Sequence, residues 1–320
     1  MIIVTGAAGF IGSQLIHKLN EENYNYIIAV DKFDNEIKNK NLEGLKIKEK
    51  VDRDNLMEWL DVNYEEVEFI YHIGAKTDTT LFDIELLERL NTNYTKEVWK
   101  RSVKYQIPMV YASSAATYGL GEHGYDDDEN HISELKPLNP YGQSKQDFDV
   151  WALAQKEKPF FWAGLKFFNV YGPNEYHKGR MASVIWHAYN QINKTGEMKL
   201  FRSHNPEFKD GEQQRDFVYV KDVVDVCYWL MHHRTNSGIY NLGSGKARTF
   251  LDLTKAVFAA MGKEENISFI DTPEDIRDKY QYFTEANMEK LRSIGYSKKF
   301  HELEDGVNKY VQGHLSKLSL

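Results

Sequence analysis

Gly6-Ala7-Ala8-Gly9-Phe10-Ile11-Gly12 directly follows the apolar run of residues 2–5 and opens a segment with apolar residues at three- and four-residue spacing. One glycine permits a tight turn after a strand, another lets the backbone approach a phosphate, and the last allows helix and strand to pack closely. The amides at the start of the helix then face the anion. The GxxGxxG spacing alone is moderately specific, but its position between a strand and a helix favours dinucleotide binding over a glycine-rich connection.

The first half of the chain alternates short apolar runs with longer amphipathic segments. This alternation is typical of βαβ units that form a parallel sheet. We therefore expect an α/β fold, with a Rossmann-type doubly wound parallel sheet and a smaller mixed α/β lobe for the substrate. The expected strands are residues 2–5, 27–31, 67–73, 109–112 and 160–165. The expected helices are residues 11–21, 84–105, 141–155, 181–192, 220–231, 250–261, 285–294 and 303–314.

The pattern loosens beyond Gly172, and this change predicts a domain boundary. Residues 1–170 are expected to form the NAD(P)-binding Rossmann domain, to which a later segment, about 215–245, returns. Residues 171–320 are expected to form mainly the substrate-binding lobe. The acidic run 126–129 and the polar stretch 205–212 are expected to be solvated loops, because such runs are usually exposed.

The net charge and the lengths of the apolar runs argue against some classes of binding partner. The 320 residues carry a formal net charge of -8, so the chain as a whole has no positive field for nucleic acid or an anionic membrane. The N-terminus lacks the basic start of a signal peptide, and no run approaches the ~20 apolar residues of a membrane span. We therefore expect a cytoplasmic protein that binds neither nucleic acid nor membrane. The only cysteine, Cys227, is expected to be buried, and His232-His233 has no partner at ligand spacing, so no metal is expected.

Asp31 ends the second expected strand, where a carboxylate usually accepts hydrogen bonds from the adenosine ribose. This position favours NAD. Lys32, Lys38, Lys40 and Arg53 lie nearby in the sequence, and two of them on a 2′-phosphate would favour NADP. Each lysine alone is equally compatible with an exposed surface charge. We expect NADP, with NAD as the alternative.

A second motif combines a hydroxyl-rich strand end with a tyrosine and a lysine. Residues 112–119 follow an expected strand and place Ser114 at its carboxyl end, where open α/β sheets bind ligands. Tyr141 and Lys145 lie one helical turn apart and share a face. A tyrosine has an ordinary pKa of ~10, and a neighbouring ammonium and a cationic nicotinamide favour its phenolate. Tyr141 is then expected to remove a hydroxyl proton while hydride leaves the same carbon, with Ser114 hydrogen-bonded to the same oxygen.

A tyrosine and a lysine at this spacing also occur on ordinary helices. The glycine stretch, the serine strand and the Tyr-Lys pair nevertheless occur together and in the required order. Chance is a poor explanation for all three.

At these residues the sequence resembles the extended short-chain dehydrogenase/reductases, whose nucleotide-sugar epimerases and dehydratases share the glycine stretch, a Ser or Thr, and YxxxK. Further segments are similar to those of the ADP-L-glycero-D-manno-heptose 6-epimerases, and the likeness runs essentially from end to end. These segments are residues 111–119, 167–173, 177–179, 181–184, 215–220 and 277–284. The His177-Lys178-Gly179 element is more specific than the superfamily motifs.

The motifs and the resemblance together imply three sets of site residues. The catalytic set is Ser114, Tyr141, Lys145 and Lys178, and Tyr141 and Lys178 match the family's two proposed bases. The cofactor-binding set is Gly6, Gly9, Phe10, Ile11, Gly12, Asp31, Lys32, Lys38, Arg53, Ile73, Gly74, Ala75, Lys76, Thr77, Asn91, Tyr141, Lys145, Val170 and Lys178. The substrate-binding set is Asn169, Arg180, His187, Phe201, Arg202, Ser203, His204, Arg215 and Tyr280.

The resemblance implies that the enzyme inverts C6 of the heptose in an ADP-heptose, for the inner core of lipopolysaccharide. The alcohol would be oxidised to a ketone and hydride returned to its other face, so that bound NADP is regenerated. Each base would serve one stereochemical form, although a lysine at position 178 could instead bind phosphate. The resemblance also implies a homo-oligomer, a pentamer as in the family.

Two other functions stay open on the sequence. The first is a UDP-sugar 4-epimerase or a sugar dehydratase on the same scaffold; Ala115 and Ala116 after Ser114 argue against the dehydratase, which needs an acidic residue there. The second is a dinucleotide-binding regulator without catalysis, which generally loses the tyrosine or the lysine that this chain keeps.

Overall fold

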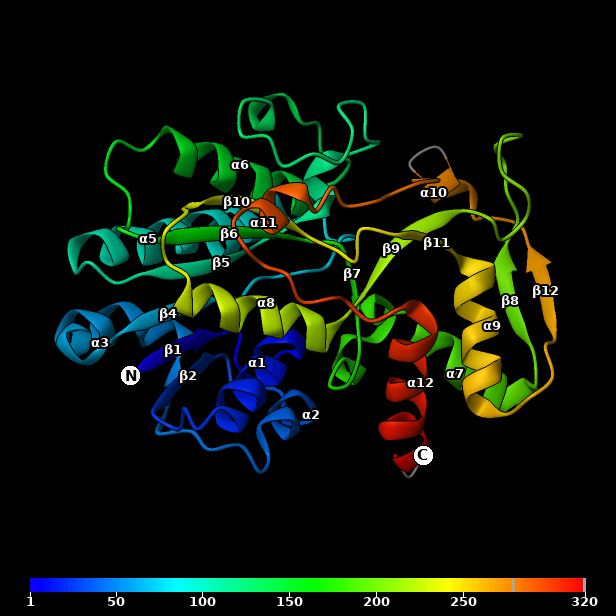
Figure 1. The fold of residues 1–320 in the computed structure, drawn as a ribbon, viewed down its shortest axis with the longest axis horizontal. Helices are drawn as coiled ribbons and strands as arrows, with labels where there is room; N and C mark the ends of the chain where they lie inside the picture. Colours follow the sequence, from blue (N-terminus) through cyan, green and yellow to red (C-terminus); the bar gives the residue numbers. More distant parts are fainter. Residues whose placement is uncertain (278–279, 319–320) are drawn as a thin grey trace. The chain divides into compact units, whose positions relative to one another are not determined.

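The computed structural model describes residues 1–277 and 280–318, so positions 278 and 279 of the 277–284 segment lie outside the described residues. The chain divides into two compact units (Figure 1). Unit 1 comprises Met1–Phe167, Val224–Asn241 and Glu289–Tyr296. Unit 2 comprises Phe168–Val223, Leu242–Met288 and Ser297–Leu320.

A parallel sheet forms the centre of unit 1, and the predicted α/β class is confirmed. In the described residues its strand order is β10-β6-β5-β4-β1-β2-β3. The strands are β1 (Ile2–Thr5), β2 (Ile27–Asp31), β3 (Glu49–Asp52), β4 (Phe69–His72), β5 (Met109–Ser114), β6 (Trp162–Phe167) and β10 (Gly238–Leu242). From β1 the chain continues outward to β2 and β3 on one side and then to β4, β5 and β6 on the other. The order reverses beside β1, and ligands of such sheets bind at the carboxyl ends next to this reversal.

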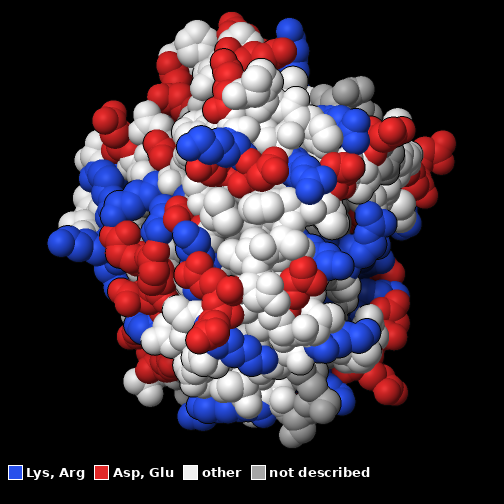
Figure 2. Space-filling model, turned by 90° about the vertical axis from the view of Figure 1, so that its right-hand side faces the viewer, with Lys and Arg blue, Asp and Glu red and all other residues white. Residues whose placement is uncertain are grey.

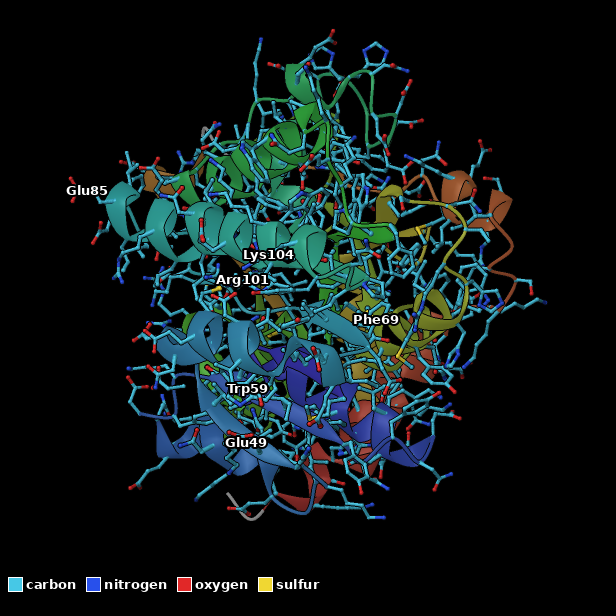
Figure 3. The ribbon with its side chains drawn as sticks, turned by 90° about the vertical axis from the view of Figure 1, so that its left-hand side faces the viewer. Glu49, Trp59, Phe69, Glu85, Arg101 and Lys104 are labelled. Carbon is cyan, nitrogen blue, oxygen red and sulfur yellow. The ribbon has the colours of Figure 1, made fainter. Side chains whose placement is uncertain are left out.

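Helices pack along these strands (Figure 1). They include α1 (Phe10–Glu21), α3 (Leu56–Asn63), α5 (Tyr94–Lys104), α6 (Pro140–Ala154) and α11 (Glu289–Ser293), while α8 (Val220–His232) has residues in both units. Figure 3 shows Arg101 on α5 and Trp59 on α3. The guanidinium of Arg101 donates to Asp61 at 3.1 and 3.0 Å, and the indole of Trp59 donates to Glu49 at 3.2 Å. These contacts tie α3 to α5 and to β3.

The single helix expected over residues 84–105 is three successive segments. They are α4 (Ile84–Leu87), a π-helical turn over Glu88–Asn93 (η4) and α5. A π-helical turn inserts an extra residue into the helical ladder and is frequent at functional sites. The expected helix over residues 285–294 is also shorter, because α11 begins only at Glu289.

The acidic run 126–129 was predicted to be a solvated loop, and this prediction is wrong for Asp127, which is 2% exposed. Its carboxylate accepts the amide of Asn241 at 2.7 Å, and that of Glu129 accepts the amide of Ile239 at 2.9 Å. Both amides belong to β10, which lies at the edge of the sheet. The amides of an edge strand need partners, and the acidic run supplies them here. Lys290 pairs with Glu129 at 2.8 Å and reduces the negative charge.

Asp127→Asn is expected to remove a pH dependence of stability. Burial raises the pKa of Asp127 to about 6 from an ordinary value of 3.8. Because the folded pKa is raised, the stabilising contribution is complete below pH ~4 and is lost as the pH rises to ~6, a fall of about 3 kcal/mol at ~1.4 kcal/mol per pKa unit. Urea unfolding between pH 4 and pH 7 measures it. The control is Asp128→Asn at the neighbouring exposed position. If the free energies of unfolding of wild type and Asp127→Asn change equally with pH, the pH dependence does not come from Asp127.

Two small sheets and three longer helices build unit 2. In the described residues one sheet has the order β11-β9-β7 and the other pairs β12 with β8. The strands are β7 (Asn169–Tyr171), β8 (Met198–Phe201), β9 (Gln214–Tyr219), β11 (Ala247–Thr249) and β12 (Ile267–Ile270). The helices are α7 (Val184–Thr195), α9 (Phe250–Met261) and α12 (Leu303–Gly313), with the short α10 (Glu274–Arg277). The polar stretch 205–212 is a loop, as predicted.

Within the described ranges, every helix is too short or too polar to span a bilayer. On the face of the molecule in Figure 2, Lys and Arg side chains lie interspersed with Asp and Glu side chains. Cys227 is fully buried, as predicted.

Candidate active site

The turn between β1 and α1 leaves no room for side chains. Gly6 has a φ of +65°, and a Cβ there would lie 2.6 Å from the Cα of Gly74. A Cβ on Gly12 would lie 2.2 Å from the carbonyl oxygen of Gly6. Helix α1 begins after Gly9 without a side-chain cap and without an acidic residue in its first turn. A bare helix N-terminus of this kind fits an anion, and the turn therefore fits the pyrophosphate of a dinucleotide.

Asp31, at the end of β2, is bound on both carboxylate oxygens. One oxygen accepts the amide of Ala8 at 2.9 Å, and the other accepts the amide of Lys32 at 2.7 Å and the ammonium of Lys38 at 2.5 Å. Lys38 also reaches the glycine turn, since a Cβ on Gly9 would lie 4.0 Å from its Cε. Of the basic residues predicted to reach the cofactor, Lys38 is therefore the one whose side chain lies at both Asp31 and the turn.

Lys32 and Arg53 are paired with acidic side chains next to β3. The ammonium of Lys32 lies 3.2 Å from Asp52 and 3.1 Å from Asp54. The Nε of Arg53 lies 3.4 Å from the carboxylate of Asp54.

The segment after β4, residues 73–77, is held by Asn91 from the π-helical turn. The side-chain oxygen of Asn91 accepts the amide of Lys76 at 2.8 Å, and its nitrogen donates to the carbonyl of Lys76 at 3.0 Å. The same nitrogen donates to the hydroxyl of Ser144 on α6 at 2.9 Å. Asn91 thus fixes the backbone of the predicted cofactor segment relative to the helix that carries Tyr141 and Lys145.

His72 connects the ends of β1 and β4. Its ring nitrogens lie 2.8 Å from the hydroxyl of Thr5 and 2.9 Å from that of Thr95, and Thr5 also accepts the amide of Gly74 at 3.0 Å. Burial, together with the charge of Lys145, lowers the pKa of His72 to about 3. The imidazole is therefore neutral. Its two hydrogen bonds hold the end of β4 to α5 and to the end of β1, directly before the glycine turn.

Ser114, Tyr141 and Lys145 meet at the carboxyl end of β5. Asn139 caps α6 by accepting the amide of Gly142 at 2.8 Å, and Pro140 occupies the first turn, where a missing N–H has little cost. The start of α6 is thereby fixed, and Tyr141 forms a side-chain hydrogen bond with Ser114. One turn later, the ammonium of Lys145 donates to the carbonyl of Ala112 at 2.8 Å.

The surroundings shift the acidity of both groups on α6. Burial raises the pKa of Tyr141, and the hydrogen bond with Ser114 opposes this. Burial lowers the pKa of Lys145 to about 8, and the carboxylate of Asp149, one further turn along α6, opposes this. Lys145 is therefore a buried cation that begins to titrate just above neutral pH.

Lys178, in unit 2, lies in a short 3-10 segment, η7 (Tyr176–Met181), where Gly179 has a φ of +52°. Burial lowers the pKa of Lys178, and the carboxylate of Glu175 opposes this. Glu175 is 1% exposed and accepts the amide and the hydroxyl of Ser183 at 2.5 and 2.7 Å. The lysine thus lies near a buried carboxylate that is itself held in place.

An arginine and two aromatic rings from the predicted substrate set lie together in unit 2. The guanidinium of Arg215 lies 5.4 Å from the ring centre of Tyr280, and the rings of Tyr280 and Phe201 are 6.4 Å apart, edge to face. Arg215 donates to the carbonyls of Gln214 and Gln281, and these bonds orient it. This cluster combines a cation with aromatic faces.

The other predicted residues of unit 2 lie around this cluster or on separate elements. Arg202 pairs with Asp271 at 3.3 Å, Ser203 donates its amide to Asp210 at 2.9 Å, and His204 accepts the amide of Thr272 at 3.3 Å. Asn169 and Val170 are on β7, Arg180 is in η7 and His187 is on α7. Asn169, Arg180 and His187 are exposed.

The sequence interpretation missed the side chains that hold the candidate residues in place. Ser144 and His72 are two of them, and Asp149 and Lys166 form a buried ion pair behind β5. Two signals were present in the sequence. Asp149 follows Tyr141 and Lys145 at four-residue spacing on one face of α6, and Lys166 is a charge directly after the apolar run expected as a strand at residues 160–165.

The described residues contain no group of three or more His, Cys, Asp or Glu side chains placed to hold a metal ion. The glycine turn after β1 and the meeting of Ser114, Tyr141 and Lys145 fit an enzyme that uses a dinucleotide cofactor. Residues 2–243 match the NAD dependent epimerase/dehydratase family, and the chain belongs to this family. Its description supports a nicotinamide dinucleotide as cofactor.

Three proteins that are similar to this chain bear the same name. A Fusobacterium nucleatum protein named ADP-L-glycero-D-manno-heptose-6-epimerase is 51% identical over 99% of this chain and 98% of its own length. A protein of the same name from Nitratidesulfovibrio vulgaris (strain DP4) is 48% identical over the same shares. The crystal structure of the Helicobacter pylori ADP-L-glycero-D-manno-heptose-6-epimerase matches with a TM-score of 0.81 at 27% identity, covering 98% of this chain and 95% of that chain.

Proposed function

We propose that this enzyme inverts C6 of the heptose in ADP-D-glycero-β-D-manno-heptose to give ADP-L-glycero-β-D-manno-heptose, for the inner core of lipopolysaccharide. The observation that carries the proposal is the meeting of Ser114, Tyr141 and Lys145 at the carboxyl end of β5. Full-length relatives that bear this enzyme's name support the choice of substrate. The reaction is redox-neutral, so the protein is an isomerase.

A nicotinamide bound at the glycine turn would supply the hydride acceptor and donor for C6. Tyr141, as the phenolate, removes the proton from the C6 hydroxyl. Ser114, already hydrogen-bonded to Tyr141, donates to the same sugar oxygen and holds it in line. Burial raises the pKa of Tyr141, and the positive charges of Lys145 and of an oxidised nicotinamide would offset this rise and favour the phenolate.

Inversion requires a proton transfer for each of the two configurations of C6. Lys178 is the proposed second base. A lysine whose pKa is lowered by burial exchanges its proton more readily near neutral pH. The carboxylate of Glu175 opposes this lowering.

The nucleotide half of the substrate is assigned to unit 2. Phe201 and Tyr280 offer faces for the adenine, and the guanidinium of Arg215 can pair with the diphosphate. Asn169, Arg180, His187 and residues 202–204 are proposed to complete the contacts with the ADP-sugar. The homo-oligomer and the cytoplasmic location remain predictions.

NADP is the proposed form of the cofactor. The ammonium of Lys38 lies against Asp31 and beside the glycine turn, where the adenosine ribose is expected. A carboxylate paired with an ammonium repels a 2′-phosphate less than a free carboxylate does, and the ammonium can itself pair with the phosphate. Lys32 and Arg53 add positive charge nearby, although both are paired with acidic residues.

Lys38→Met is expected to weaken NADP binding by roughly 10- to 100-fold, since a charge-assisted hydrogen bond contributes ~1.5–3 kcal/mol. NAD binding should stay the same or tighten, because the Asp31 oxygen that Lys38 occupied is then free to accept a ribose hydroxyl. Isothermal titration of both cofactors measures the effect, and Lys40→Met, at an exposed position, is the matched control. An equal loss for NAD and NADP would contradict the assignment of the 2′-phosphate to Lys38.

The function itself is tested by incubating the purified enzyme with ADP-D-glycero-β-D-manno-heptose and following the configuration of C6 by NMR. The expected result is interconversion of the two C6 epimers without net reduction of the cofactor. No interconversion with cofactor bound would overturn the proposal. A parallel incubation with UDP-galactose covers the UDP-sugar 4-epimerase, since turnover there alone would assign that activity instead.

A further inference from the structure

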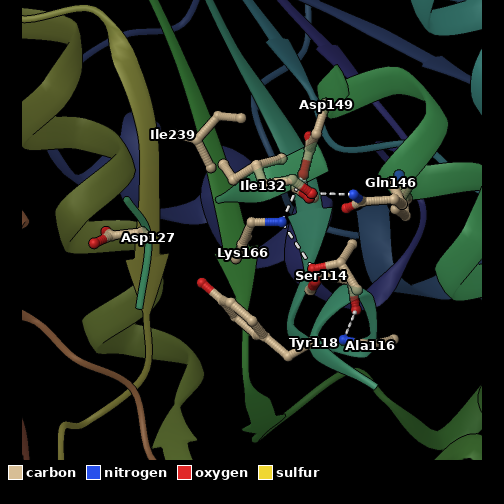
Figure 4. A network of polar contacts seen from close by, with 12 residues as sticks. Ser114, Ala116, Tyr118, Asp127, Ile132, Gln146, Asp149, Lys166 and Ile239 are labelled. Atoms are coloured by element: carbon tan, nitrogen blue, oxygen red, sulfur yellow. Dashed lines mark hydrogen bonds and ion pairs between the residues drawn. The ribbon is translucent and has the colours of Figure 1, made fainter. Parts of the chain in front are cut away.

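Lys166 on β6 and Asp149 on α6 form an ion pair that is wholly inside unit 1 (Figure 4). Both side chains are 0% exposed, and the ammonium lies 2.8 Å from the carboxylate. Charges this deeply buried are costly to desolvate, and an apolar pair of similar volume often stabilises a protein as well or better. Stability alone is therefore a weak explanation for this pair.

The pair is bonded to the residues on either side of Ser114. Lys166 donates to the hydroxyl of Thr117 at 2.7 Å, and that hydroxyl donates to the carbonyl of Ser114 at 2.9 Å. Asp149 accepts the hydroxyl of Ser113 at 2.6 Å. Figure 4 shows the ammonium of Lys166 between Asp149 and the turn that carries Ser114. The ion pair thereby fixes the backbone from which the Ser114 hydroxyl projects.

Asp149 also acts on Lys145, which precedes it by one turn on the same face of α6. Its negative charge opposes the effect of burial on the pKa of Lys145. Among the described residues, His72 on β4 also interacts with Lys145, and this imidazole is neutral. Asp149 itself pairs with Lys166 on β6 and accepts the hydroxyl of Tyr111 on β5 at 3.0 Å. One buried carboxylate is therefore shared by two buried ammonium groups.

We propose that Asp149 and Lys166 are positioning residues of the active site, in which the pair aligns Ser114 through Ser113 and Thr117, and Asp149 keeps Lys145 protonated. This inference rests on the proposed roles of Ser114, Tyr141 and Lys145. It adds a second layer of residues that act on the reaction without touching the sugar.

The test compares Asp149→Asn, Lys166→Met and the double variant in the holoenzyme. Asp149→Asn leaves two buried ammonium groups without their carboxylate, so the pKa of Lys145 falls. The alkaline limb of the kcat profile, on which Lys145 loses its proton, then moves to lower pH. The double variant removes both charges of the pair, so it recovers folding stability relative to the single variants, yet its alkaline limb stays displaced. In Lys166→Met, Lys145 is the one of the two ammonium groups that still interacts with Asp149. The alkaline limb of the kcat profile of this variant therefore does not move to lower pH.

A second readout requires no sugar substrate. Side-chain NMR of ¹⁵N-lysine-labelled enzyme follows the titration of the Lys145 amine directly, with Lys145→Arg assigning the signal. A lower midpoint in Asp149→Asn and in the double variant supports the proposal, and a midpoint equal to that of wild type overturns the charge role. Failure of the wild type to epimerise ADP-heptose would overturn the proposed function only, and this titration would still decide on Asp149.

The alignment role is tested by Thr117→Val, which removes only the hydroxyl between Lys166 and Ser114 and remains informative if the charge variants fail to fold. We expect kcat to fall by roughly 10- to 100-fold with little change in KM, because small displacements of catalytic groups are costly. The titration of Lys145 should stay unchanged. The matched control is Thr254→Val in unit 2, a buried threonine whose hydroxyl has no hydrogen-bond partner within the described residues. Equal kcat in Thr117→Val and Thr254→Val would overturn the alignment role.

Discussion

Tyr141→Phe is expected to lower kcat for C6 epimerisation by about 10²- to 10⁴-fold, the range that a positioned acid or base contributes. The substitution removes the phenolic oxygen and leaves the ring, which is 9% exposed and packed in unit 1. Ser114 loses the hydrogen bond with Tyr141 but can still bind the sugar oxygen, so KM should change little. The rate of C6 inversion, followed by NMR with saturating NADP, measures the effect.

The control for this prediction is Tyr26→Phe, at a surface tyrosine that is 70% exposed. It makes the same chemical change away from the candidate site and should leave kcat unaltered. If Tyr141→Phe keeps the full kcat, the phenol is not the base, and the non-catalytic regulator becomes the better interpretation of the dinucleotide site.

Gly12→Ala is expected to weaken NADP binding by at least ~100-fold, about 2.7 kcal/mol. The added methyl group would lie 2.2 Å from the carbonyl oxygen of Gly6 and 3.1 Å from the Cα of Ala7. The glycine turn must then open, and the amides that receive the pyrophosphate move. Overpacking of this kind also costs ~1–3 kcal/mol of stability. Isothermal titration with NADP and urea unfolding measure the two effects.

Gly313→Ala is the matched control, since a Cβ at this position of α12 meets nothing within 4 Å. It should leave NADP binding intact and can add up to ~1 kcal/mol of stability, because alanine favours a helix over glycine. Tight NADP binding by Gly12→Ala would show that the turn tolerates a side chain and would place the pyrophosphate elsewhere.

Several elements could be predicted from local sequence because their signals are local. The strands expected at residues 2–5 and 27–31 have the bounds of β1 and β2, and the helix expected at 250–261 has those of α9. In each case a short apolar run or a helical spacing lies between clear breaks. β3 was not predicted. Glu49 and Lys50 are exposed and Val51 alone is buried, so this edge strand has no apolar run in the sequence.

The short strands of unit 2 were not predicted for a related reason. β11 has three residues of intermediate exposure, and β12 has no buried residue. Such segments become strands because a partner lies beside them, as when Ala247–Thr249 pairs with β9. Propensity and periodicity do not record the presence of that partner.

By itself, the sequence determined the βαβ order, the glycine turn after β1 and the presence of Tyr141 and Lys145 one turn apart. These features depend on neighbours within a few residues, so a linear pattern suffices to identify them. The tertiary structure alone decided that the carboxylate of Asp127 accepts the amide of Asn241, 114 positions away. It also decided that the side chain of Asn91 accepts the amide of Lys76. It also decided that Lys166 and Asp149 meet behind Ser114. These pairs form because the sheet order brings distant strand ends together, and burial then requires each polar group to find a partner.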